Sequence, residues 1–231
     1  MNHTVQGHGS GTAFAEGAFP FQISDHPRLR LSTDFDKPEL RRALRARRHA
    51  LSPQLRERAA DALAANATAL RVWQLARRIG FYLSNDSEID PMPLMARARS
   101  RGKCCYLPVL SRINGDRLWF APLQHDTPMR ANRFGIPEPC VSARELVRAA
   151  ALDLILMPLV GFDADGNRLG MGGGFYDRSL DFLRGRRFWR KPHLVGLAYD
   201  FQRVDALPVN DWDVPLMSIV TDRQTYITAQ P

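Results

Sequence analysis

The chain has 231 residues, of which 45% are hydrophobic, and it carries 32 lysines and arginines against 24 acidic residues. This composition predicts a folded globular protein, and its three cysteines, which form no C-x-x-C pair, exclude a framework of disulfides. No apolar run reaches the ~18 residues that a membrane helix needs, and the N-terminus lacks a secretory signal, so we expect a cytoplasmic protein without a membrane partner.

The first part of the chain differs in character from the rest. Residues 1–33 show no sustained hydrophobic period and begin with the glycine-rich stretch Gly7–Gly11, so we predict a flexible extension there. Residues 34–231 are predicted to form a single α/β domain.

Two helices are predicted at the start of this domain. The first begins after Asp36, with Glu39 at the spacing of a capping box. Three arginines, Arg41, Arg45 and Arg48, recur at i, i+4 and i+7 and therefore share one basic face of this helix. The second helix follows a Ser-Pro pair, which is typical of a helix start.

Short apolar runs then alternate with segments of helical composition. The runs predicted as strands are Ile79–Leu83, Cys104–Leu110, Leu118–Leu123, Leu152–Val160, Leu194–Tyr199 and Ser218–Thr221. The segments predicted as helices are Pro93–Arg101, Ala143–Ala151 and Phe175–Leu183. Strands that alternate with helices indicate an α/β fold whose mostly parallel sheet is covered on both faces.

The most informative segment is MPLVGFDADGNRLGMGGGFYDR at residues 157–178. A buried strand ends at Val160 and is followed by Arg168, by four glycines within residues 170–174 and by a predicted helix. Glycines let backbone N–H groups approach an anion, a helix N-terminus adds positive potential, and an arginine donates two hydrogen bonds to a phosphate. The segment therefore favours a phosphate-binding loop, and a flexible turn without a ligand is the alternative.

Three familiar motifs do not fit this segment. A Walker A loop requires a lysine after its last glycine, and none stands there. The dinucleotide fingerprint almost fits from Gly170, but its last position is Phe175. A calcium loop beginning at Asp163 fails because Arg168 occupies the position of the required glycine and Gly174 that of the required glutamate.

Five segments occur in the order that is typical of one enzyme family. They are Lys37–Arg41 (KPELR), Tyr82–Ser84 (YLS) followed by Glu88–Asp90 (EID), Phe134–Pro139 (FGIPEP), Arg168–Arg178 (RLGMGGGFYDR) and Trp212–Leu216 (WDVPL). In these segments the chain resembles the 5-formyltetrahydrofolate cyclo-ligase family, and the resemblance extends from Lys37 to Asp222. It departs from the family at Met217, where many members carry an acidic residue, which leaves the number of metal ions open.

The resemblance implies a three-layer α/β/α fold with a mostly parallel central sheet. It also implies an enzyme that uses ATP and Mg2+ to close 5-formyltetrahydrofolate to 5,10-methenyltetrahydrofolate, with release of ADP and phosphate. In this reaction ATP phosphorylates the formyl oxygen, which is otherwise a poor leaving group, and N10 then attacks the activated carbon. Catalysis would come from positioning and from neutralising charge.

The matching positions imply roles for individual residues. The expected catalytic residues are Lys37, Arg41 and Arg168. The expected ATP-binding residues are Lys37, Pro38, Glu39, Leu40, Arg41, Arg168, Leu169, Gly170, Met171, Gly172, Gly173, Gly174, Phe175 and Tyr176. The expected folate-binding residues are Leu83, Glu88, Phe134 and Tyr176, and the expected Mg2+ ligands are Asp177 and Asp213.

Each of these roles has a structural alternative. Lys37 and Arg41, one helical turn apart, can face the same phosphates or can form an ordinary solvated helix face. Glu88 can accept two parallel N–H bonds from the edge of a pterin, or it can be a helix N-terminal charge ahead of Pro91. Asp213 can be a hard-oxygen metal ligand or part of a surface turn.

Two other classes of function compete with the cyclo-ligase. A basic surface attracts anions, so the arginine face of the first helix could bind RNA, although the sequence contains no recognised nucleic-acid signature. A relative that kept the nucleotide site could phosphorylate another acid or a sugar. We expect a monomer that binds 5-formyltetrahydrofolate and ATP and does not bind nucleic acid.

Overall fold

A computed structural model describes residues 36–111, 116–184 and 191–228. The predicted flexible extension at residues 1–33 lies outside the described residues. No helix in the described ranges is long and apolar enough to cross a membrane.

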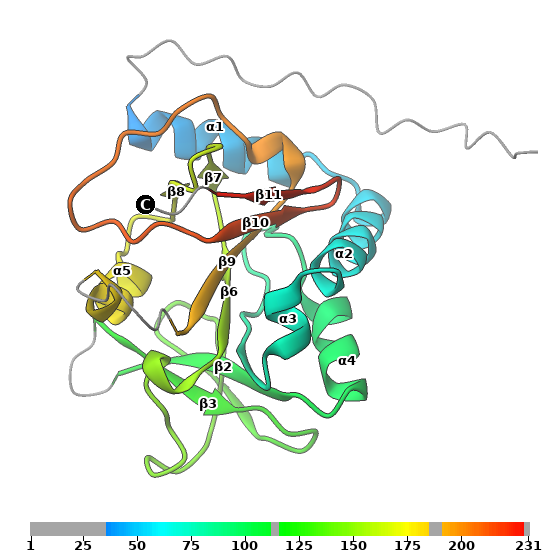
Figure 1. The fold of residues 1–231 in the computed structure, drawn as a ribbon, viewed down its shortest axis with the longest axis vertical. Coiled ribbons are helices and arrows are strands. Elements are labelled where there is room, and N and C mark those ends of the chain that lie inside the picture. Colours follow the sequence, from blue (N-terminus) through cyan, green and yellow to red (C-terminus); the bar gives the residue numbers. More distant parts are fainter. Residues whose placement is uncertain (1–35, 112–115, 185–190, 229–231) are drawn as a thin grey trace, which may run out of the picture.

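The core of the fold is a seven-stranded sheet with the order β11-β10-β9-β6-β1-β2-β3 (Figure 1). In chain order the strands are β1 (Arg78–Gly80), β2 (Cys104–Leu110), β3 (Leu118–Pro122), β6 (Leu154–Pro158), β9 (His193–Ala198), β10 (Ser218–Thr221) and β11 (Thr225–Ile227). The five inner strands pair in parallel, whereas β3 and β11 pair antiparallel at the two edges. This arrangement confirms the predicted α/β fold with a mostly parallel sheet.

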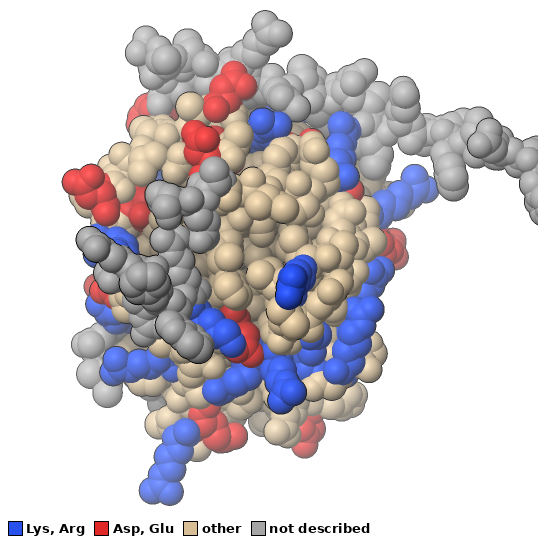
Figure 2. Space-filling model, in the orientation of Figure 1, with Lys and Arg blue, Asp and Glu red and all other residues tan. Residues whose placement is uncertain are grey.

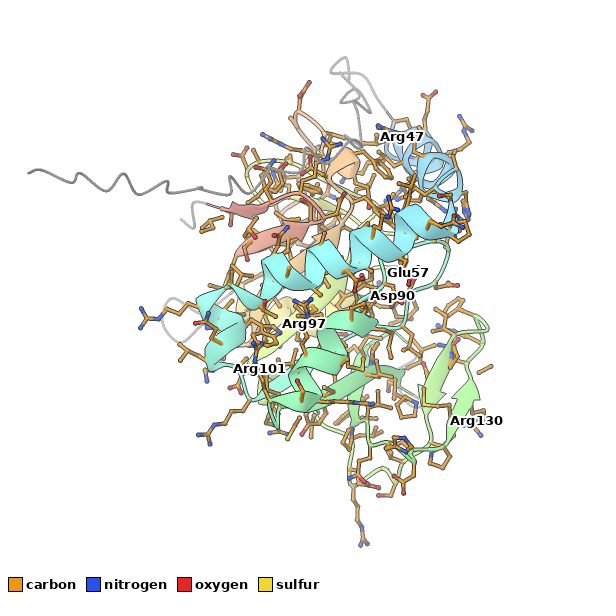
Figure 3. The ribbon with its side chains drawn as sticks, turned by 90° about the vertical axis from the view of Figure 1, so that its right-hand side faces the viewer. Arg47, Glu57, Asp90, Arg97, Arg101 and Arg130 are labelled. Carbon is orange, nitrogen blue, oxygen red and sulfur yellow. The ribbon has the colours of Figure 1, made fainter. Side chains whose placement is uncertain are left out.

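Helices cover the two faces of the sheet unequally. One face carries α2 (Pro53–Thr68), α3 (Arg71–Leu75) and α4 (Met92–Ser100), which Figure 3 shows from outside, with Arg97 on α4 and Arg101 directly after it. The other face carries α5 (Phe175–Leu180), the short 3-10 helices η1 (Ala149–Ala151) and η2 (Asp181–Leu183), and irregular segments. The second helical layer is therefore thin, and the sheet is buried there largely by loops.

Two small ribbons and one further 3-10 helix lie outside the main sheet. The ribbons are β4 (Met129–Ala131) with β5 (Pro137–Pro139) and β7 (Gly161–Phe162) with β8 (Arg168–Leu169), and the 3-10 helix is η3 (Asp200–Gln202). The β7–β8 ribbon begins directly after β6 and leads into the glycine-rich segment. It thereby fixes where this segment leaves the sheet.

The helix α1 (Lys37–His49) lies across the end of the sheet at which the parallel strands finish, at the top of Figure 1. Its apolar residues Leu40 and Leu44 are buried against Val160, which follows β6, and against Leu169 in β8. The helix begins after Asp36 as predicted, but the Asp36 side chain makes no capping hydrogen bond. Packing therefore fixes α1 in place beside the loops that follow β6.

One predicted helix is wrong. Residues 143–151 form turns and only a short 3-10 helix, although their composition is rich in alanine. Val147 instead pairs antiparallel with Phe120, with backbone hydrogen bonds of 2.9 Å in both directions. A tertiary contact with the sheet has overridden the local helix propensity.

The strand order defines where a ligand would be expected. The chain passes from β1 to β2 on one side, whereas β6 continues to β9 on the other, so the order reverses between β1 and β6. Ligands of open α/β sheets bind outside the carboxyl ends of the strands at such a switch point. Here the two loops that meet at this point are the one after β1, which contains Glu88, and the one after β6, which contains the glycines.

Candidate functional site

The glycine loop is held against α1 by Arg41. The Arg41 Nε donates a 2.8 Å hydrogen bond to the carbonyl of Gly170, and the guanidinium lies beside Gly172. Gly172 and Gly174 have backbone φ angles of +98° and +63°, which residues other than glycine adopt only with strain. Lys37 is half-buried in the first turn of the same helix, one turn before Arg41, so the two segments that are predicted to bind phosphate meet at Arg41.

Arg168 is nearly buried beneath this loop and is already paired. Its guanidinium donates to the carboxylate of Asp177 on α5 and to the backbone carbonyl of Val214. Burial lowers the pKa of Arg168, while the negative charges of Asp177 and Asp213 oppose that change. Arg168 therefore joins β8, α5 and the segment before β10, and part of its hydrogen-bonding capacity is used before any phosphate arrives.

The predicted metal ligands Asp177 and Asp213 both lie near Arg168. The carboxylate of Asp177 accepts a hydrogen bond from Arg168. The carboxylate of Asp213 accepts a 2.9 Å hydrogen bond from the backbone N–H of Asn210, as in a surface turn. Within the described ranges no three acidic, histidine or cysteine side chains gather as a metal site. One or two carboxylates suffice for a Mg2+ ion that takes its other ligands from ATP phosphates and waters, so this pair fits such an ion and does not fit an all-protein cage.

Glu88 lies in a half-buried position in the loop after β1. Burial raises the pKa of its carboxyl from 4.5 to about 7, and a hydrogen bond from the Asn85 backbone N–H and the charge of Arg48 offset this only in part. Burial raises the pKa of Tyr82 and Tyr176, and the negative charge of Glu88 adds to this rise in both. Since Tyr176 lies on α5 directly after the glycine loop, the predicted folate and nucleotide residues converge.

An aromatic pair lies at the outer side of the glycine loop. Phe134, 55% exposed, meets the ring of Phe175 edge-on with centroids 5.8 Å apart. The guanidinium of Arg133 lies 5.0 Å from the Phe134 ring, and that of Arg178 lies 5.5 Å from Phe175. The exposed Phe134 ring therefore offers a flat apolar surface, and cationic side chains lie beside it.

Several residues expected at the site have other surroundings. Leu40 and Leu169 are buried in the same apolar cluster, so their side chains contribute packing. Leu83 is partly buried against the main core, and the exposed Glu39 forms a 3.8 Å ion pair with Arg42. Packing and a surface ion pair are what the structure shows for these side chains, and their expected roles in binding ATP or folate stay predictions.

The remaining residues of the glycine segment are open to solvent or close to it. Met171 is 48% exposed and Pro38 is also exposed. A side chain at Gly173 would meet the ring of Phe175 at 2.8 Å, so glycine is needed there because the backbone passes close to an aromatic. The loop therefore presents backbone, and few side chains, to an incoming ligand.

The chain matches known proteins over most of its length. A sequence model of the 5-formyltetrahydrofolate cyclo-ligase family matches residues 34–222. The chain belongs to this family. The cyclo-ligase of Escherichia coli strain K12 is 36% identical over 185 residues, which cover 79% of this chain and 98% of that enzyme. The cyclo-ligase of Haemophilus influenzae is 38% identical over 184 residues, which cover 80% and 96%.

Solved structures agree with the fold of this cyclo-ligase family member. The 5,10-methenyltetrahydrofolate synthetase of Aquifex aeolicus matches with a TM-score of 0.70 at 29% identity, over 84% of this chain and 94% of that one. The synthetase of Mycoplasma pneumoniae matches with a TM-score of 0.62 at 25% identity, over 81% and 99%. The predicted family, fold and class of enzyme are thereby confirmed, whereas the roles of single residues stay predictions.

The arginine face of α1 has a different use from the one considered from the sequence. Only Arg41 reaches the glycine loop, whereas Arg45 and Arg48 both bind the carboxylate of Asp86 in the loop of Glu88. Sequence reasoning missed Asp86, because no local pattern links a residue after β1 to a helix about forty positions earlier. The helical spacing of the arginines was the only signal available.

Proposed function

We propose that this protein catalyses the ATP-dependent cyclisation of 5-formyltetrahydrofolate to 5,10-methenyltetrahydrofolate, with ADP and phosphate as the other products. The observation that supports this most is the meeting of α1, the glycine loop and the Glu88 loop at the switch point of the sheet, inside the range that matches the cyclo-ligase family. One end of this arrangement suits phosphates, and the other offers a half-buried carboxylate for a pterin.

The first step transfers the γ-phosphoryl group of ATP to the formyl oxygen. The formamide oxygen attacks phosphorus and ADP leaves. In this step Lys37 and Arg41 neutralise phosphate charge, and the glycine loop donates backbone N–H groups. Arg168, held by Asp177, adds a fixed positive charge beneath the loop.

The second step closes the ring. The lone pair of N10 attacks the activated carbon, N10 loses its proton to the solvent, the carbon–oxygen bond breaks and phosphate leaves, so that no oxidant or further reactant is needed. Glu88 holds the pterin edge by accepting N–H bonds, and Tyr176 and Phe134 flank the substrate. The protein contributes mainly orientation, because the two reacting groups belong to one molecule.

Mg2+ would bind between the ATP phosphates and the carboxylates of Asp213 and Asp177, where it would neutralise phosphate charge. The two carboxylates near Arg168 are suited to an ion that arrives with the nucleotide. Cytoplasmic localisation and a monomeric state are also part of this proposal and rest on the sequence alone.

Binding of RNA is less well supported than it was from the sequence. Two of the three arginines on the α1 face are occupied by Asp86, which leaves Arg41 as the member of this set that faces the glycine loop. On the face drawn in Figure 2, basic side chains are spread around a mostly uncharged centre, with one inside it and acidic ones among them. Figure 3 shows the same spread on a second face, from Arg47 on α1 to Arg130 on β4.

The test is a direct assay of the purified protein with 5-formyltetrahydrofolate and Mg-ATP. We expect the methenyl chromophore to appear in the near ultraviolet, with one ADP formed per methenyl group and no product when ATP is omitted. A folded protein that binds ATP but forms no product would contradict the folate assignment. Formation of ADP together with a phosphorylated product, when another acid or a sugar replaces the folate, would favour the alternative of a kinase.

A further inference from the structure

The carboxylate of Asp86 is surrounded by cationic side chains of α1. Arg45 donates to both carboxylate oxygens at 2.7 and 3.0 Å, and Arg48 donates at 2.5 Å. His49 Nε2 lies 2.8 Å from the carboxylate, and its Nδ1 lies 3.1 Å from the hydroxyl of Ser87. The hydrogen bonds of Arg45 in particular hold the pKa of Asp86 at about 2, so this carboxylate is ionised at neutral pH.

The loop that carries Asp86 has an unfavourable backbone conformation. Asp86 and Ser87 have φ of 51° and 58°, in the left-handed region that residues other than glycine rarely adopt. Two adjacent residues in this region are strained, so contacts elsewhere must hold them there. The α1 side chains that bind Asp86 supply these contacts.

This conformation determines where Glu88 lies. The Ser84 hydroxyl donates to the Glu88 carbonyl at 2.7 Å, and the Glu88 N–H donates to the Asn85 carbonyl at 3.0 Å. The Asn85 N–H in turn donates to the Glu88 carboxylate at 3.2 Å. The loop 84–88 therefore closes on itself around Asp86, and Glu88 cannot keep its direction if the turn opens.

Arg48 connects this loop to the end of the sheet. Its side chain is 0% exposed, binds Asp86 and lies 3.4 Å from the carbonyl of Leu159, directly after β6. The same helix holds the glycine loop through Arg41. The helix α1 thus connects the loop after β1 to the segment after β6 on the two sides of the switch point.

We propose that Asp86 is a positioning residue for folate: clamped by Arg45, Arg48 and His49, it keeps the 84–88 loop in the turn that directs Glu88 at the pterin. This rests on the proposed function, in which Glu88 binds the folate. Asp86 does not touch substrate and acts through Glu88. The competing explanation is that the cluster only stabilises the fold, as any partly buried ion pair can.

The first test compares Asp86→Asn with a matched control, Asp153→Asn. Asparagine tolerates a left-handed φ and keeps the shape of the side chain, so the change removes chiefly the charge. Asp153 also has its pKa held at about 2, against the effect of burial, by Lys191 and by two backbone N–H groups. It directly precedes β6, however, and so lies at the amino ends of the parallel strands, opposite the end that carries the site. Both variants should unfold at lower temperature than the wild type.

The two variants should differ in their kinetics. At a temperature at which both are folded, we expect Asp86→Asn to raise the KM for 5-formyltetrahydrofolate about tenfold, as for one misdirected hydrogen bond to a charged group. The KM for ATP should stay within about twofold, and Asp153→Asn should leave both values within about twofold. Equal changes in the two KM values, or none, would overturn the positioning role.

A double-mutant cycle gives a readout that a purely structural role would not produce. If Asp86 acts through Glu88, then Asp86→Asn should change folate affinity less than about twofold in a Glu88→Gln background. Folate and ATP affinities are measured separately by calorimetry. Additive losses in the double variant would mean that Asp86 acts independently of Glu88, and the proposal would be wrong.

A milder variant covers the case in which Asp86→Asn does not fold. Arg45 is 43% exposed, so Arg45→Met removes the partner of the Asp86 carboxylate on its solvent side. The pair of Asp86 with the buried Arg48 stays in place. We expect a two- to fivefold rise in the KM for folate, smaller than for the full removal of the charge. Arg42→Met, at a position 79% exposed on the same helix, is the control and should change neither KM.

Failure of the proposed function is distinguishable from failure of this inference. If the wild-type enzyme does not convert 5-formyltetrahydrofolate, the proposed function and the positioning role are both overturned. A second pattern overturns only the positioning role. In it, the wild type converts 5-formyltetrahydrofolate and Arg45→Met has the same KM for folate as Arg42→Met. Asp86→Asn is then either unfolded or has the KM for folate of the wild type.

Discussion

Replacing Glu88 with glutamine removes a carboxyl that burial makes hard to ionise. In the folded protein the pKa of Glu88 is raised to about 7, against 4.5 in the unfolded chain. Between these two pH values the native state holds a proton that the unfolded state has lost. The carboxyl therefore makes its full contribution below pH 4.5, and stability falls as the pH rises through this window to 7.

The size of the effect follows from the shift. At 1.36 kcal/mol per pKa unit, a change of ~2.5 units corresponds to about 3 kcal/mol. Because solvent reaches the half-buried side chain, we expect the observed value to lie at about 1–3 kcal/mol. Glutamine does not titrate, so the difference in unfolding free energy between wild type and Glu88→Gln should change by this amount between pH 4.5 and 7 and stay constant above.

The assay is urea unfolding of both proteins at several pH values. Other groups that titrate in the window, such as Asp222, whose pKa burial raises, are common to both proteins and cancel in the difference. A difference that stays flat between pH 4.5 and 7 would show that the carboxyl is solvated and would refute the reasoning. A rise in wild-type stability with pH, relative to the variant, would show that Arg48 outweighs burial.

Folate binding offers a second measurement on the same residue. A pterin that donates N–H bonds to the carboxylate favours the ionised form, so binding near pH 7 should release about half a proton per site. Calorimetry in buffers of different ionisation enthalpy measures this number. Glu88→Gln should release none and should lose roughly 10- to 150-fold in folate affinity, while its ATP affinity should barely change.

Three further substitutions test the nucleotide side. Arg41→Met, which loses the bond to Gly170, should raise the KM for ATP about tenfold and the KM for folate much less, as steady-state kinetics would show. Gly172→Ala has room for its methyl group but is strained at φ +98°, so calorimetry should show weaker ATP binding by about 1–3 kcal/mol; unchanged binding would mean that the loop rearranges freely. Arg168→Met leaves the carboxylate of Asp177 unpaired and should lower the free energy of unfolding by about 3–5 kcal/mol in denaturant titrations, and a loss of activity without loss of stability would contradict this structural role.

The sequence predicted the sheet well because its strands are short apolar runs between turn residues. The bounds of β2 and β10 agree with the prediction to the residue, and β6 and β9 agree to within two. The helix predicted at residues 143–151 was wrong because alanine-rich composition favours a helix only when no tertiary contact competes. The reversal of strand order between β1 and β6, which places the site, is a property of the assembled sheet and has no local signal.

The candidate site was predictable where a motif is contiguous, and less so where distant segments meet. The glycine loop and its helix are one continuous segment, and the structure adds the φ values that explain the glycines. The surroundings of Leu40, Leu169 and Arg168 depend on what folds over them, so a motif alone could not tell ligand contact from packing. The Asp86 cluster joins positions about forty residues apart, and helical spacing showed only its basic half.

The cations of α1 have different surroundings at its two ends. In the C-terminal half of the helix, Arg45 and Arg48 pair with the single carboxylate of Asp86, which offsets part of their charge. Near the N-terminus Lys37 and Arg41 add to the positive end of the helix dipole, which is an unfavourable place for cations. Because an anion bound beside them would relieve this repulsion, the helix is best stabilised when phosphate is present. In the proposed function, the same helix attracts ATP with its first turns and holds the Glu88 loop through Arg45 and Arg48, so that one basic face serves both substrates.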